Sequence, residues 1–286
     1  MTTENADHLT STTPAPAPPL AALRPGFVRI ARPIARAVQQ AARLADPCCR
    51  SWPRLIVAAT LIGALPIGLG ALCGSGWHQP LSALPLAAVV WSCARRGDWR
   101  QGMASLAVAF LVHSLVALGL ASQAPAIAAE IFPDAEAYWQ RQQVWIQTGR
   151  DPEYELRGWG PAHVQLACGT TLYSFTSLGV VTLAQGFYEV DLMNYYNARL
   201  WDQSRSGVRS LFWGWHVWSL LRGLGYVILT YEVVALAVGF FSGERIRGWS
   251  DRLRRAAVGA GCLIADAGTK WLMLDVVRRQ LFDNLL

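Results

Sequence analysis

The side chains most able to do chemistry in this sequence are ionisable groups inside long apolar runs. Glu232 lies in the middle of GLGYVILTYEVVALAVGFF. Ionisable groups at membrane depth are costly, so they are expected to be paired or used. The Glu232 carboxylate is able to bind a proton or a cation, or to form a salt bridge with another helix. We expect the structural use, in which Glu232 fixes the packing of helices.

His113 lies in the middle of a second run, AFLVHSLVA. A neutral imidazole at this depth is able to ligate haem iron or another metal, or to relay protons. A haem held by two histidines needs a second histidine at similar depth, but His163 and His216 fall near the ends of apolar runs. The sequence therefore favours a hydrogen bond between helices for His113.

The richest polar cluster is QGFYEVDLMNYYNARLWD, residues 185–202. On a helix, Glu189 and Asp191 point to opposite sides, whereas Asp191, Asn194 and Asn197 share a face. That stripe is able to coordinate a cation or receive a partner loop if other segments supply oxygen ligands. One aspartate and two asparagines are too few for a site alone. We therefore predict a solvated helix exit with aromatic anchors.

Arg222 ends an aromatic stretch, LFWGWHVWSLLR, at residues 211–222. Tryptophans of this kind gather at membrane interfaces, where indole N–H groups reach the lipid headgroups. We expect the Arg222 side chain to extend toward the same headgroups. Binding of lipid or phosphate by Arg222 with Arg205 and Arg209 is the alternative.

Motifs that would identify an enzyme are absent from the sequence. It contains no GxxxxGK[ST] loop, no HExxH, no GxSxG and no CxxC pair. These patterns mark nucleotide-binding loops, zinc proteases, elbow-type hydrolases and redox or zinc cysteines. The sequence thus assigns no catalytic residue, no metal site and no cofactor.

The elements that must position these groups are transmembrane helices. Hydrophobic residues make up 53% of the 286-residue chain and charged residues only 15%, whereas soluble domains average about a quarter charged residues. About 20 apolar residues cross the hydrocarbon core as a helix. The fold class predicted is an all-α, polytopic transmembrane helical bundle of four to six spans. Four runs qualify as spans: 55–73, 103–121, 164–186 and 223–241.

Two further runs leave the number of spans open. Residues 80–94 are short and carry two prolines, and residues 256–275 carry Asp266 and Lys270, spaced to pair on a helix. Six spans place the 95–100 arginines in the cytoplasm, but they leave the basic stretch 242–255 outside. Four spans reverse both placements. Because cytoplasmic loops carry the excess of Arg and Lys, neither count is free of conflict; six is favoured.

The remaining segments define the predicted domains. Residues 1–25 are rich in Thr, Ala and Pro and predict a disordered tail. Residues 26–54 predict a basic amphipathic juxtamembrane segment that lies on the membrane. The transmembrane domain covers 55–286, with a long acidic loop at 122–163 that holds one short amphipathic helix within 127–147.

Charge and composition predict partners and location. Of the 25 basic residues 24 are arginines clustered beside apolar runs, which favours anionic lipid headgroups at the N-terminal segment and no nucleic acid. Abundant Ala and Arg with one Lys favour a bacterial inner (plasma) membrane, with the N-terminus cytoplasmic. A membrane protein partner or a second copy is also expected.

Three function classes fit the sequence. The first is a non-catalytic accessory, assembly or structural subunit, which predicts scattered polar residues and aromatic anchors. The second is a small transporter or channel that uses intramembrane Glu232. The third and least favoured is a membrane enzyme with an interfacial site at 185–202.

Overall fold

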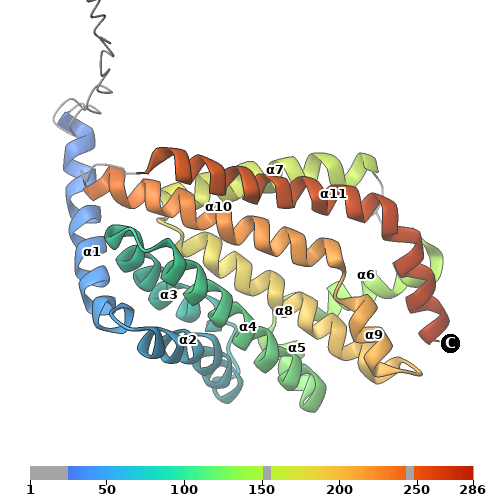
Figure 1. Cartoon of the computed structure of the whole chain (residues 1–286). Helices are drawn as coiled ribbons and strands as arrows, with labels where there is room; N and C mark the ends of the chain where they lie inside the picture. The colour runs from blue at the N-terminus through green and yellow to red at the C-terminus, as the bar shows by residue number, and fades with distance from the viewer. Residues whose placement is uncertain (1–24, 151–155, 243–247, 286) are drawn as a thin grey trace, which may run out of the picture.

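The computed structural model of the chain describes residues 25–150, 156–242 and 248–285. Nearly all of the predicted N-terminal tail lies outside these residues. The described part is all-α (Figure 1). Its eleven helices are α1 (Pro25–Cys49), α2 (Trp52–Cys73), α3 (His78–Arg96), α4 (Trp99–Gln123), α5 (Pro125–Ile131), α6 (Ala135–Thr148), α7 (Leu156–Thr176), α8 (Val180–Gln203), α9 (Gly207–Gly214), α10 (Val217–Ser242) and α11 (Trp249–Leu285).

Three of the described helices are long and apolar enough to cross a membrane. These are α2, α4 and α10, with mean hydropathies of 2.2, 2.1 and 1.9 over their most apolar windows. They coincide with the runs predicted at 55–73, 103–121 and 223–241. The prediction of apolar helices in these three places is therefore confirmed.

A single helix over the predicted span 164–186 is wrong. The chain turns between α7 and α8, where Leu178 and Gly179 have φ angles of 54° and 88°. The turn is fixed from outside, because the Trp91 indole N–H donates to the Leu178 carbonyl at 2.7 Å. A Cβ at Gly179 would lie 2.5 Å from a methyl group of Val234, so only glycine fits there. Residues of one apolar run thus belong to two helices that run in opposite directions.

Helices α10 and α11 pack antiparallel, with the most extensive contact in the molecule (Figure 1). Their backbones approach closely at Gly225 and Gly259, where an added Cβ on Gly225 would lie 2.8 Å from the Gly259 carbonyl oxygen. Small residues permit this approach between membrane helices. The two uncertain runs, 80–94 and 256–275, are both helical and fall within α3 and α11.

Helix α1 crosses one end of the bundle instead of running along it (Figure 1). Its buried side chains repeat at helical spacing and face the bundle: Val38, Ala42, Ala45 and Cys49. Pro33 and Pro47 are accommodated within the helix. The predicted amphipathic helix is present, and its position on a membrane surface stays a prediction.

The described part of the acidic segment 122–163, which leaves out residues 151–155, is more ordered than the predicted loop with one helix. It forms α5 and α6 and contributes the first part of α7. Trp139 and Trp145 of α6 are 1% exposed and belong to a core that also includes Tyr196 of α8. The segment therefore covers one end of the bundle as packed structure.

Candidate functional site

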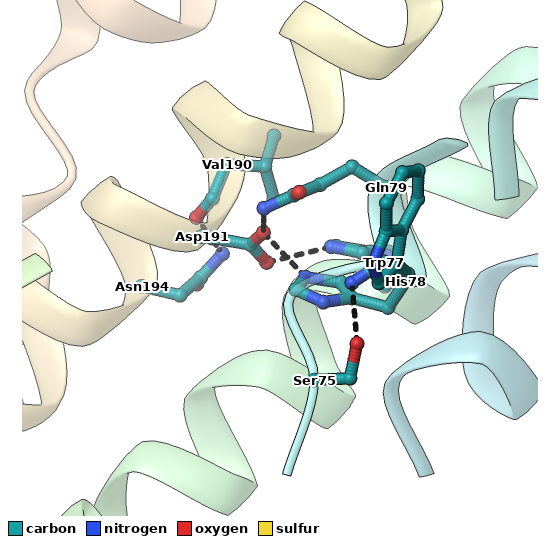
Figure 2. Close-up of polar contacts among 8 residues, drawn as sticks. Ser75, Trp77, His78, Gln79, Val190, Asp191 and Asn194 are labelled. Carbon is teal, nitrogen blue, oxygen red and sulfur yellow. Dashed lines mark hydrogen bonds and ion pairs between the residues drawn. The ribbon is translucent and has the colours of Figure 1, made fainter. Parts of the chain in front are cut away.

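Three ionisable side chains from three helices meet inside the bundle. His78 Nε2 lies 2.8 Å from Oδ2 of Asp191, and His113 Nε2 lies 2.7 Å from Oδ1 of the same carboxylate. Gln79 donates its side-chain N–H to Oδ2 at 2.8 Å. Figure 2 shows His78 and Gln79 reaching the Asp191 carboxylate from one side. We call His78, His113 and Asp191 the His–Asp–His cluster.

The turn before α3 gives a local reason for the position of His78. His78 is the first residue of α3 and follows a tight turn that begins at Gly74, where φ is 60°. A Cβ on Gly70 would lie 2.9 Å from the Ser75 carbonyl oxygen and 3.4 Å from His78 Cβ. Glycine at position 70 thus lets the turn fold back, so that His78 enters the bundle instead of pointing to its surface.

The cluster is closed off by aromatic side chains. Phe132, which follows α5, lies with its ring centroid 5.5 Å from that of His78. Phe187 of α8 lies 4.5 Å from the His113 ring. All three members of the cluster are 0% exposed. Their interactions therefore take place away from bulk solvent, where electrostatic interactions are strong.

Hydrogen bonding satisfies the carboxylate but not the imidazoles. Asp191 faces three nitrogen groups, whereas Nδ1 of His78 and Nδ1 of His113 are buried without a partner among the described residues. One ligand atom from each member lies within 4.8 Å of the others, close enough to hold one metal ion. The chemistry available here is proton exchange between imidazole and carboxylate, or coordination of a cation.

The structure differs from the sequence prediction for 185–202. Glu189 is exposed and Asp191 is buried, so the two carboxylates face different surroundings as expected. Asp191, Asn194 and Asn197 are all buried, which contradicts a solvated helix exit. The two asparagines donate to carbonyls of their own helix, at Val190 and Met193. The predicted oxygen stripe is thus replaced by a site in which Asp191 meets histidines.

His113 takes part in a contact between helices, as the sequence favours, but through a residue that sequence reasoning missed. His78 falls in the short connection between the predicted runs 55–73 and 80–94, and a histidine there reads as a loop residue. Only the turn after α2 brings it to the depth of His113, with 5.9 Å between ring centroids. The available signal was the pair His78–Gln79 directly before an apolar run.

Glu232 is paired as the structural interpretation expects. Its side chain is 3% exposed, and it forms ion pairs with Arg252, at 3.3 Å, and with Arg255 of α11. The Arg255 guanidinium also lies 5.3 Å from the centroid of the Trp99 ring. The carboxylate therefore joins α10 to the start of α11.

Arg222 is held within the protein instead of extending to headgroups. Its guanidinium donates twice to the Asp266 carboxylate, at 3.0 and 3.1 Å. His163 Nε2 lies 3.5 Å from the same carboxylate. Asp266 was expected to face Lys270, which is also buried on α11. The double contact with Arg222 ties α10 to α11 at a second level.

His216, a buried histidine directly before α10, belongs to an aromatic core and not to the His–Asp–His cluster. The His216 ring stacks on that of Trp218 with 4.4 Å between centroids, and its centroid lies 6.0 Å from that of Trp145 and 5.9 Å from that of Tyr196. Burial, assisted by the positive charges of Lys270 and Arg222, lowers the pKa of His216 to about 3. The ring is therefore neutral at physiological pH and acts as part of an aromatic core.

Comparison with known proteins adds no family to these observations. The sequence matches no protein-family model, and no curated protein or solved structure is similar to it.

Proposed function

We propose that this chain is a polytopic integral membrane protein with a non-catalytic role, as an accessory, assembly or structural subunit. The observation that carries the proposal is that the buried carboxylates are paired with side chains of other helices. Glu232, Asp266 and Asp191 are each engaged by side chains of another helix. Costly charges that join helices contribute to the architecture of a bundle. The three long apolar helices support a location in the membrane.

The distribution of arginines supports one orientation. Arg96 lies 3.9 Å from Asp46 of α1, and Arg255 stacks on Trp99. These contacts bring α1, the α3–α4 turn and the start of α11 to one end of the bundle, which we call the basic end. Because positive charge is retained in the cytoplasm, the basic end is the cytoplasmic one. The α7–α8 turn adds one pass to the predicted six. With this extra pass, the α3–α4 turn and the start of α11 lie on the same side of the membrane.

Seven passes give the two termini different locations. Helix α1 lies at the basic end, whereas α11 finishes at the other end of the bundle (Figure 1). In the proposed topology α2, α3, α4, α7, α8, α10 and α11 traverse the bilayer, the N-terminus is cytoplasmic and the C-terminus is on the far side. Six passes would place both termini on one side.

Protease accessibility of terminal tags tests this topology in the full-length chain. We expect a C-terminal tag to be cleaved in spheroplasts and an N-terminal tag to be cleaved only in inverted inner-membrane vesicles. Cleavage of both tags in the same preparation would contradict seven passes. Recovery of the chain in the soluble fraction would contradict a membrane protein altogether.

A test of Glu232 separates the structural role from the transport alternative. In Glu232→Gln two arginines lose their charged partner, so we expect lower resistance to unfolding in detergent. Glu189→Gln is the matched control, because Glu189 is an exposed glutamate on α8 whose carboxylate accepts from Gln185 of its own helix at 2.8 Å. A Glu232→Gln protein with unchanged stability but lost ion flux in proteoliposomes would favour the transporter.

An accessory role also implies a binding partner in the membrane. We propose a partner membrane protein or a second copy of this chain, with anionic lipid headgroups at the basic end. Purification of the tagged chain from its native membrane in mild detergent, followed by mass spectrometry, tests this point. Recovery of the chain as a single copy alone would contradict a dedicated subunit.

A further inference from the structure

We propose that the His–Asp–His cluster binds one divalent transition-metal ion. This inference goes beyond the proposed membrane role and does not depend on the number of spans. It rests on the ligand types, their spacing and their burial.

The spacing of the donor atoms suits a shared ion. Transition-metal bonds to His nitrogen and carboxylate oxygen are about 2.0–2.2 Å long, so neighbouring ligands around one ion lie about 3–3.5 Å apart. The cluster has nitrogen-to-oxygen separations of 2.8 and 2.7 Å, with both imidazoles presenting Nε2 to one carboxylate. One ligand atom from each of the three members lies within 4.8 Å of the others, which is close enough for one ion to contact all three.

The burial of a charge favours the ion. The Asp191 carboxylate is 0% exposed and lies between two buried imidazoles. Buried charges in proteins are paired with other charges or coordinate metals.

The ligand set indicates the class of ion. Two imidazole nitrogens with one carboxylate oxygen suit Zn²⁺, Fe²⁺ or Co²⁺, whereas Mg²⁺ and Ca²⁺ prefer oxygen ligands alone. Gln79 donates to Asp191 Oδ2 and thus orients the carboxylate as an outer partner. Such partners typically contribute 10–100-fold to metal affinity.

Because the ligands come from α3, α4 and α8, the ion would join three helices of the bundle. These segments lie far apart in the sequence, since His78 and Asp191 are separated by 113 positions. An ion that binds the folded chain and not the unfolded one raises its stability, and the gain grows with the logarithm of the ion concentration. Removal of the metal is therefore expected to lower the thermal midpoint of the protein.

The test is a Co²⁺ titration of the full-length chain in mild detergent after treatment with a chelator. We expect one equivalent of Co²⁺ to bind with visible d–d absorption, and Zn²⁺ to displace it. Asp191→Asn and His78→Gln should abolish stoichiometric binding, and Gln79→Ala should weaken it about 10–100-fold. His163→Asn is the matched control, because His163 lies outside the cluster and should leave the titration unchanged.

A second variant keeps the proposal testable if the cluster variants fail to fold. His113→Cys retains a metal-ligating side chain, so its Co²⁺ complex should gain a sulfur-to-cobalt charge-transfer band. The proposal is overturned if the wild-type chain binds no Co²⁺, Zn²⁺ or Fe²⁺. It is also overturned if Co²⁺ binds equally to wild type and Asp191→Asn, or if His113→Cys binds with no sulfur signature.

Discussion

The ion pair between Arg222 and Asp266 predicts that removing its two members has unequal costs. Asp266 has a side chain that is 1% exposed, whereas the Arg222 side chain is 26% exposed. Arg222→Gln therefore strands a carboxylate in the interior of the bundle. Asp266→Asn instead leaves a guanidinium that is able to extend along its aliphatic chain toward the headgroup region.

The magnitudes follow from burial. Removing one partner of a buried pair typically costs about 3–5 kcal/mol in the free energy of unfolding. In Arg222→Gln the His163 ring, 3.5 Å from Asp266, still faces the carboxylate. We therefore expect this variant to lose about 3 kcal/mol in the free energy of unfolding, at the lower end of that range. For Asp266→Asn the lost charge-assisted hydrogen bonds contribute about 1.5 kcal/mol. The double variant removes both charges and should be more stable than Arg222→Gln alone.

Unfolding in SDS, followed by tryptophan fluorescence, measures all four members of this cycle. The predicted order of stability is wild type, Asp266→Asn, the double variant close to it, and Arg222→Gln last. If Arg222→Gln is no less stable than Asp266→Asn, the buried carboxylate is not the costly partner and the reasoning fails. Additive effects would show that the two groups do not interact at all.

Two further predictions use other parts of the bundle. Between pH 6.5 and about 3 the unfolded chain binds a proton at His216 that the folded chain excludes, because burial lowers the pKa of this residue. Stability should therefore fall by about 1.4 kcal/mol for each pH unit below 6.5; thermal unfolding at pH 7 and 5 checks this, and a His216→Leu protein with the same pH dependence would refute it. Gly225→Ala should destabilise the chain by about 1–3 kcal/mol through overpacking against Gly259. Gly119→Ala, where an added Cβ meets nothing within 4 Å, should be neutral or stabilising, and equal effects of the two changes in SDS unfolding would contradict the close approach of α10 and α11.

Sequence reasoning located the apolar helices well because their signal is local. The apolar helices α2, α4 and α10 were predictable from composition and length alone. It failed at the α7–α8 turn, because Leu178 and Gly179 look like ordinary members of an apolar run. The backbone reverses there through contacts with Trp91 and Val234, which are remote in the sequence. Tertiary packing thus overrode a hydropathy pattern.

The candidate site was predictable only in pieces. Asp191 and His113 were singled out because polar groups inside apolar surroundings are unusual, and both are in the cluster. Their association was not predictable, since it depends on which helix faces which at one depth. His78 was missed because hydropathy treats the start of α3 as a connection. Arg222 was placed at the headgroups, because nothing near it in the sequence reveals the Asp266 carboxylate.

The three residues of the His–Asp–His cluster are far apart in the sequence, so the ribosome synthesises them at different times. Asp191 follows His113 by 78 positions. At a synthesis rate of about 5–20 residues per second, the ribosome makes the aspartate roughly 4–16 s after the second histidine. By the time Asp191 is made, all residues of α3 and α4, including both histidines, have been synthesised. The cluster is therefore complete only after α8 has been synthesised and has packed against α3 and α4. A chain that stops before residue 191 contains both histidines but lacks the carboxylate that they contact.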